Sequence, residues 1–197
     1  MVTISPGFAD PVLSAQSSFR AIMEAMARPG TIGALTEPVS APLPFSRAAA
    51  IVALTLCDQD TPLWLDARLA SPDIAYWLRF HTGAPIVGEP QRAAFAFLAE
   101  PQNAPGFDAF ALGTAEYPDR SATVVLQVES LEDGPAVTLR GPGIKGQSTV
   151  RARSLPPDFT SRLAANRALF PMGVDLLLVT DNAIVALPRS VQVVGGP

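Results

Sequence analysis

Short β-branched and aliphatic runs alternate with segments of helical spacing along this chain of 197 residues. The sequence predicts strands at residues 61–65, 93–98, 122–128, 136–139, 175–180 and 183–187. Helices are predicted between them, at residues 14–27, 47–56, 71–81 and 157–169. Interleaved strands and helices favour a layered α/β domain. We therefore expect a single three-layer domain over residues 1–197, with a mixed β-sheet flanked by helices.

Local signals set the ends of several elements. The first helix ends at Pro29-Gly30, because proline does not continue a helix and glycine accepts the turn. Residues 47–56 are almost entirely apolar, so this helix is expected to be buried. Asp181-Asn182 separates the last two strands and predicts a hairpin, which supplies an antiparallel part of the sheet.

Charge is scarce, and this limits the classes of partner. Charged residues make up 16% of the chain, below the usual share of about a quarter. Two explanations of this low charged share stay open. Subunit contacts cover part of the surface, or the composition is merely rich in alanine. The first leads us to expect a homodimer. The net charge of −4 and the lack of a Lys/Arg cluster argue against nucleic acid as a partner. No apolar run approaches the length that a membrane span needs and no signal peptide is evident, so we expect a cytoplasmic protein without membrane contact.

The usual catalytic residue types are few. The chain has one cysteine, one histidine and one lysine, which are Cys57, His81 and Lys145. Cys57 ends an apolar helix and is interpreted as a core residue, while His81 at a helix C-terminus suits the helix dipole. A Cys–His pair and a ligand-binding role for His81 stay open as alternatives. Asp58, Asp60 and Asp66 are too few for a metal site of hard ligands, so no metal is expected.

The most glycine-rich segment is residues 141–146, Gly-Pro-Gly-Ile-Lys-Gly. Glycine loops can hold phosphate groups, but this one lacks the P-loop spacing and no helix is predicted after it. A tight turn between two strands is the favoured interpretation.

Seven stretches together resemble the PhnH family, the H subunit of the carbon–phosphorus lyase core complex. They are FRAIMEAMARPGT (19–31), LTLCDQDTPLWL (54–65), FHTGAP (80–85), GTAEYPDRSAT (113–123), LRGPGIKG (139–146), NRALFPMGVDLLLV (166–179) and ALPRS (186–190). Each stretch alone is a weak signal. The seven occur in the order of the family and span nearly the whole chain, which makes the set specific.

The resemblance implies a fold similar to the large domain of pyridoxal-phosphate-dependent transferases, without that cofactor. It also implies a non-catalytic or accessory subunit that is needed to form alpha-D-ribose 1-phosphonate 5-triphosphate from ATP and a phosphonate. The implied partners are the G, I and J subunits, and the chemistry belongs to the I and J subunits. Lys145, the sole lysine, lies in the predicted glycine turn and is poorly placed to hold pyridoxal phosphate.

No catalytic residue is carried over from the family. The candidate ligand or partner contacts are polar loop residues of the matching motifs, namely Arg28, Gly30, Asp58, Thr61, His81, Thr82, Asp119, Ser121 and Arg189. We expect Arg28, Asp58, His81, Asp119 and Arg189 to cluster in space. The alternatives to the accessory subunit are a stand-alone transferase or hydrolase, with a nucleotide pocket lined by Arg28, Asp58 and His81, and a nucleotide- or phosphonate-binding module.

Overall fold

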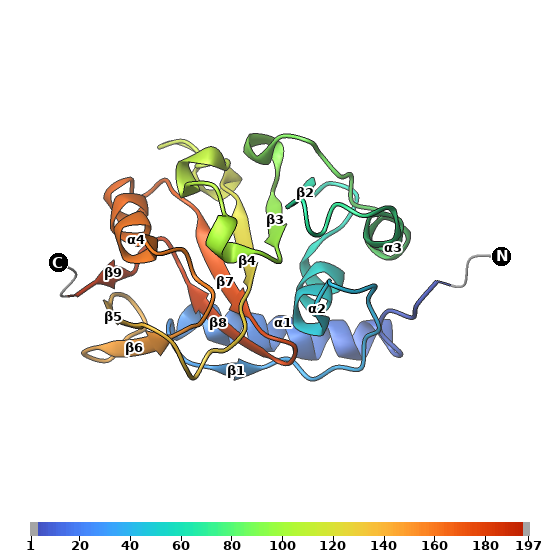
Figure 1. Cartoon of the computed structure of the whole chain (residues 1–197), viewed down its shortest axis with the longest axis horizontal. Helices are drawn as coiled ribbons and strands as arrows, with labels where there is room; N and C mark the ends of the chain where they lie inside the picture. Colours follow the sequence, from blue (N-terminus) through green and yellow to red (C-terminus); the bar gives the residue numbers. More distant parts are fainter. Residues whose placement is uncertain (1–3, 195–197) are drawn as a thin grey trace.

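A mixed six-stranded sheet forms the centre of the molecule (Figure 1). The computed structural model describes residues 4–194. The strand order is β1 (Gly33–Ala34), β8 (Ala183–Leu187), β7 (Asp175–Val179), β4 (Thr123–Gln127), β3 (Phe95–Leu98) and β2 (Leu63–Leu65). Strands β2, β3, β4 and β7 are parallel, whereas β8 is antiparallel to β7 and β1 is antiparallel to β8. The predicted α/β class, mixed sheet and closing hairpin are therefore confirmed.

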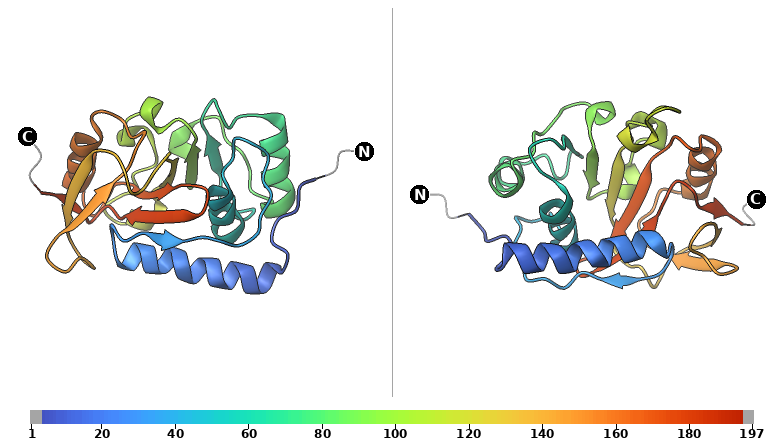
Figure 2. Two further views of the ribbon diagram at one scale, coloured as in Figure 1. Left: turned by 60° about the horizontal axis from the view of Figure 1, so that its bottom comes forward. Right: turned by 180° about the vertical axis from the view of Figure 1, so that it is seen from behind.

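Both faces of the central sheet are covered. Helices α1 (Pro11–Ala27), α2 (Arg47–Leu56) and α3 (Pro72–Thr82) lie on one face (Figures 1 and 2). Helix α4 (Phe159–Ala168) and a second sheet lie on the other, and that sheet has the order β6 (Ser148–Arg151), β5 (Ala136–Arg140) and β9 (Gln192–Val193). Along β7, Leu177 and Val179 enter the first core and Leu176 and Leu178 the second. Alternating side chains that are buried on both faces explain why the strands are continuous apolar runs.

The second sheet is a correction to the expected arrangement, in which helices alone flanked the central sheet. Strands β5 and β6 form the antiparallel pair on either side of the glycine segment, with Leu139 opposite Ser148. The interpretation of that segment as a turn is thus confirmed. Strands β1 and β9 have only two residues each and were not predicted.

Helix α1 begins at Pro11, three residues before the predicted start. Asp10 caps it, because its Oδ1 accepts hydrogen bonds from the amides of Val12 and Leu13 at 3.1 and 3.0 Å. Helix α2 has the predicted limits, and its residues 48–53 are fully buried, as expected. Within residues 4–194, no helix is both long and apolar enough to cross a membrane.

Asp66 joins the carboxyl ends of the neighbouring strands β2 and β3. Its Oδ1 accepts a hydrogen bond from the amide of Leu69 at 3.0 Å. Its Oδ2 accepts from the amides of Ala99 and Glu100 at 2.8 and 3.0 Å. Both oxygens of this buried carboxylate are thus used by the backbone, so it has a structural role.

Candidate functional site

Asp58 and Thr61 form a self-contained turn between α2 and β2. The Thr61 hydroxyl accepts a hydrogen bond from the Asp58 amide at 2.6 Å and donates to the Asp58 carbonyl at 2.8 Å. The Asp58 carboxylate accepts from the amide of Asp60 at 2.9 Å. Thr82 lies nearby, because the adjacent Gly83 packs against Gln59 within this turn. The turn accounts for two carboxylates at the end of a helix without requiring a ligand.

His81 fixes the N-terminal segment to α3. Its Nε2 lies 3.0 Å from the carbonyl oxygen of Ser5, and the Trp77 Nε1 donates to the same oxygen at 3.0 Å. Since a carbonyl only accepts, the Nε2 of His81 carries the proton. The rings of His81 and Trp77 lie 4.6 Å apart, and Gly7 packs on the imidazole. These contacts favour the structural role of His81 over the ligand role.

Arg189 and Asp175 form a bidentate ion pair at the start of β7 and the end of β8. The Nε of Arg189 lies 3.1 Å from Oδ1 of Asp175, and its NH2 contacts Oδ2. Their side chains are only 15% and 17% exposed. Arg189 also donates to the carbonyl of Pro118 at 2.6 Å, which ties down the short helix η4 (Pro118–Arg120). Asp119 and Ser121 are therefore held close to Arg189.

Arg28 and Gly30 lie where α1 meets the turn between β5 and β6. Arg28 is exposed and pairs with Glu24 one helical turn earlier, at 2.9 Å. Gly30 has a φ of +81°, and a Cβ at this position would lie 2.6 Å from the hydroxyl of Ser148. A Cβ on Gly143 would lie 2.1 Å from the carbonyl oxygen of Ala27, so the two loops are in direct contact.

The candidate residues thus fall into separate groups. The first contains Asp58, Thr61, His81 and Thr82, the second Asp119, Ser121 and Arg189, and the third Arg28 and Gly30. In the part of the chain that the structure describes, no hydrogen bond or ion pair joins the side chains of one group to those of another. Direct side-chain contacts therefore do not join Arg28, Asp58, His81, Asp119 and Arg189. Their clustering in space stays a prediction, and the backbone links the second and third groups, because the amide of Gly30 donates to the carbonyl of Ala186 at 3.2 Å.

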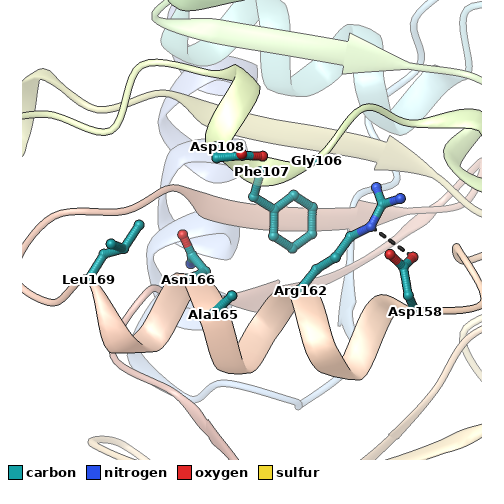
Figure 3. A pocket seen from close by; sticks show the side chains of 8 residues that line it. All are labelled: Gly106, Phe107, Asp108, Asp158, Arg162, Ala165, Asn166 and Leu169. Atoms are coloured by element: carbon teal, nitrogen blue, oxygen red, sulfur yellow. Dashed lines mark ion pairs between the residues drawn. The ribbon is translucent and has the colours of Figure 1, made fainter.

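Sequence reasoning missed a pocket of about 440 Å³ between α4 and the short helix η3 (Phe107–Ala109). Figure 3 shows its lining, which is Gly106, Phe107, Asp108, Asp158, Arg162, Ala165, Asn166 and Leu169. Helix α4 was predicted, but η3 lies in an irregular segment that has no helical or strand periodicity in its sequence. Only the fold brings the two walls together.

Arg162 and Asn166 fix the walls of the α4–η3 pocket. The guanidinium of Arg162 donates to the carbonyls of Ala104 and Pro105, both at 2.8 Å, and pairs with Asp158 at 2.8 Å. The hydrogen bond from Arg162 lowers the pKa of the Asp158 carboxyl below its ordinary value. Asn166 is buried and bonds the amide and carbonyl of Val174.

The charged groups in the lining of the α4–η3 pocket are the carboxylates of Asp108 and Asp158 and the guanidinium of Arg162. The lining contains neither a hydroxyl, thiol or amine nucleophile nor an imidazole base. Cys57 is buried elsewhere, and burial raises the pKa of its thiol far above the usual range. Lys145 is exposed in the β5–β6 turn. Within residues 4–194, no three His, Cys, Asp or Glu side chains gather as a metal site would require.

Comparison with known proteins identifies the family. The family model described as "Bacterial phosphonate metabolism protein (PhnH)" matches residues 6–194. The chain belongs to the PhnH family. A Rhizobium meliloti (strain 1021) relative is 48% identical over 188 residues, which are 95% of this chain and 94% of the relative. That relative is named "Alpha-D-ribose 1-methylphosphonate 5-triphosphate synthase subunit PhnH".

A second relative matches over a shorter range. HtxG of Stutzerimonas stutzeri, which carries a provisional assignment as a C-P lyase subunit protein, is 35% identical over 82 residues. The match covers 42% of each chain. The family resemblance drawn from the seven sequence stretches is therefore confirmed.

Proposed function

We propose that this protein is a non-catalytic or accessory subunit of the carbon–phosphorus lyase core complex. In that role it is needed to form alpha-D-ribose 1-phosphonate 5-triphosphate from ATP and a phosphonate. The observation that carries the proposal is the 48% identity, over 95% of this chain, to a relative named as a subunit of the synthase that makes the methylphosphonate product.

The G, I and J subunits are the partners in this proposal, within the cytoplasm. The exposed candidates Arg28, Asp58 and Asp119 are proposed as contacts for a partner or ligand, because their groups lie in loops at the ends of rigid elements. Arg189 is proposed to position the loop of Asp119, since it donates to the carbonyl of Pro118. His81 is proposed to position the N-terminal segment through the carbonyl of Ser5.

The whole chain is further proposed to be one domain with a fold like the large domain of pyridoxal-phosphate-dependent transferases. The central sheet supports this, because its two faces contribute to both hydrophobic cores and so connect them. No activity follows from such a likeness of fold.

We also propose a homodimer for the isolated protein. Helix α1 exposes a set of large apolar side chains to solvent, with Val12, Leu13, Phe19 and Met23 at 77%, 63%, 48% and 49% exposure. Contiguous exposed apolar surface marks interaction sites. Val12→Asp should therefore shift the mass measured by light scattering from dimer to monomer. Ala164→Asp, on exposed α4, is the control and should stay dimeric; a monomeric unmodified protein would contradict the proposal.

Native mass spectrometry tests the assembly. The tagged chain is co-expressed with the G, I and J subunits and purified. The expected result is a single assembly that contains all four proteins in fixed stoichiometry. Recovery of the tagged chain without the other three, while those three assemble with one another, would refute membership of the complex.

A further inference from the structure

A second pocket, of about 230 Å³, lies at the carboxyl ends of the parallel strands β3, β4 and β7. Besides Ser46, its polar lining comes from Gln102, Gln127, Glu129, Ser154, Thr180 and Asp181. In open α/β sheets, ligands generally bind outside the carboxyl ends of the strands, where loops diverge. We call this site the strand-end pocket. It contains none of the residues of the three candidate groups.

The floor of the strand-end pocket is fixed by hydrogen bonds. The Gln127 side chain accepts from the amide of Ser46 at 2.8 Å and donates to the carbonyl of Pro44 at 3.0 Å. This amide links the end of β4 to the start of α2. A fixed lining lowers the entropic cost of binding.

An anion is a poor occupant of the strand-end pocket. The first amides of α2 are already taken, by Gln127, by the Asp181 carboxylate and carbonyl, and by the Ser46 hydroxyl. Arg47, the basic residue beside the pocket, is paired with Asp181 at 3.0 Å. Glu129 then leaves one unbalanced negative charge in the lining, which opposes phosphate and phosphonate groups.

Four polar side chains of the lining are free for a ligand. Within residues 4–194, no hydrogen bond to the rest of the protein engages the side chains of Gln102, Glu129, Ser154 or Thr180. Together they offer donors and acceptors in a small space. Ala99 adds apolar surface to the same lining, whereas Val128 and Val179 are buried. Ser154 has a φ of +73°, a conformation that is costly for a residue other than glycine and that gathers at binding sites.

We propose that the strand-end pocket binds a neutral, polyhydroxylated molecule the size of one sugar ring. Each hydroxyl of such a ring both donates and accepts, which matches the carboxylate, amide and hydroxyl groups of the lining. Its C–H face matches the apolar surface of Ala99. The volume is below the range of about 300–1,000 Å³ that is usual for larger ligands. The inference stands on this pocket alone and does not depend on membership of the complex.

Chemical-shift mapping by NMR tests the proposal, with D-ribose as the neutral probe. D-ribose should shift the amides of Ala99 and Thr180 and the side-chain amides of Gln102 and Gln127. Ribose 5-phosphate should bind about tenfold more weakly, because Glu129 repels its phosphate. Glu129→Gln should weaken ribose binding about tenfold and abolish the preference over ribose 5-phosphate. Glu132→Gln, an exposed acid outside the pocket, is the matched control and should change neither value.

Three outcomes would overturn the proposal. Tighter binding of ribose 5-phosphate or methylphosphonate at the same amides would make this an anion site. Binding of ethanolamine without binding of ribose would make it a site for a cation. An absence of shifts at these amides with ribose in the tens of millimolar, roughly the weakest specific affinity for such a ligand, would show that no sugar binds. Unchanged thermal unfolding of both variants shows that the fold is intact in each comparison.

Discussion

Replacing Asp66 with alanine tests how the carboxyl ends of β2 and β3 are held together. The change removes the side-chain acceptor of three backbone amides. The amide of Leu69 keeps a second acceptor, the carbonyl of Asp66 at 3.0 Å, whereas those of Ala99 and Glu100 lose this partner. It adds no bulk, and alanine fits the backbone at this position. The expected effect is therefore due to the lost hydrogen bonds.

The magnitude follows from the burial of the two amides that lose their acceptor. An amide left buried without an acceptor costs about 1–3 kcal/mol. The bonds to Ala99 and Glu100 are partly buried, so water can replace the carboxylate there in part. The amide of Leu69 stays bonded to the carbonyl of Asp66 and adds little to the loss. We expect the free energy of unfolding to fall by about 2–3 kcal/mol, a substantial share of the 5–15 kcal/mol that is typical of domains. Asp66→Asn, which keeps one acceptor oxygen, should lie between alanine and the unmodified protein.

Urea unfolding measures the loss, and hydrogen exchange at Ala99 and Glu100 localises it. Both amides should exchange faster in Asp66→Ala at concentrations of urea that leave the fold intact. Asp60→Ala is the control, because the Asp60 carboxylate is exposed and makes no hydrogen bond in the described structure, so its effect should stay within about 0.5 kcal/mol. A loss below about 1 kcal/mol in Asp66→Ala would refute the reasoning.

Three further predictions each concern a single residue. Gly143→Ala should lower the melting temperature more than Gly146→Ala. Both glycines have a positive φ, but only at Gly143 would a Cβ lie 2.1 Å from the carbonyl oxygen of Ala27. Equal decreases in melting temperature would contradict this. Cys57 should react slowly with iodoacetamide from pH 7 to 9, because its raised pKa keeps the thiol protonated where a free thiol ionises. Fast alkylation of Cys57 in the folded protein, detected by mass spectrometry, would contradict this. With pyridoxal phosphate equimolar to the protein, borohydride reduction should leave Lys145 unmodified, and a stoichiometric adduct at this residue under these conditions would revive the cofactor-dependent enzyme.

The main elements could be predicted because each has a strong local signal. The apolar run at residues 47–56 gave α2 its limits, and Asp181-Asn182 gave the β7–β8 hairpin. The earlier start of α1 also had a signal, the cap Asp10 followed by Pro11, which outweighs the lack of apolar periodicity there. Strands β1 and β9 had no comparable signal, because two residues form a strand only through pairing with distant partners.

The sites were harder to predict, since contacts between distant segments define them. Arg189 was identified from a motif, yet its partner Asp175 and its bond to Pro118 depend on the strand register. The α4–η3 pocket joins a predicted helix to an irregular segment more than forty residues earlier in the chain. The strand-end pocket likewise needs the order of β3, β4 and β7, which the sequence alone did not provide.

Turnover of ATP with methylphosphonate tests the accessory role most directly. Three samples are compared: this chain alone, the G, I and J subunits without it, and all four proteins together, with released adenine as the readout. The account predicts no adenine from the chain alone, and full release only when all four are present. Adenine release by the isolated chain at the rate of the complete set would contradict the account and identify the protein as an enzyme in its own right.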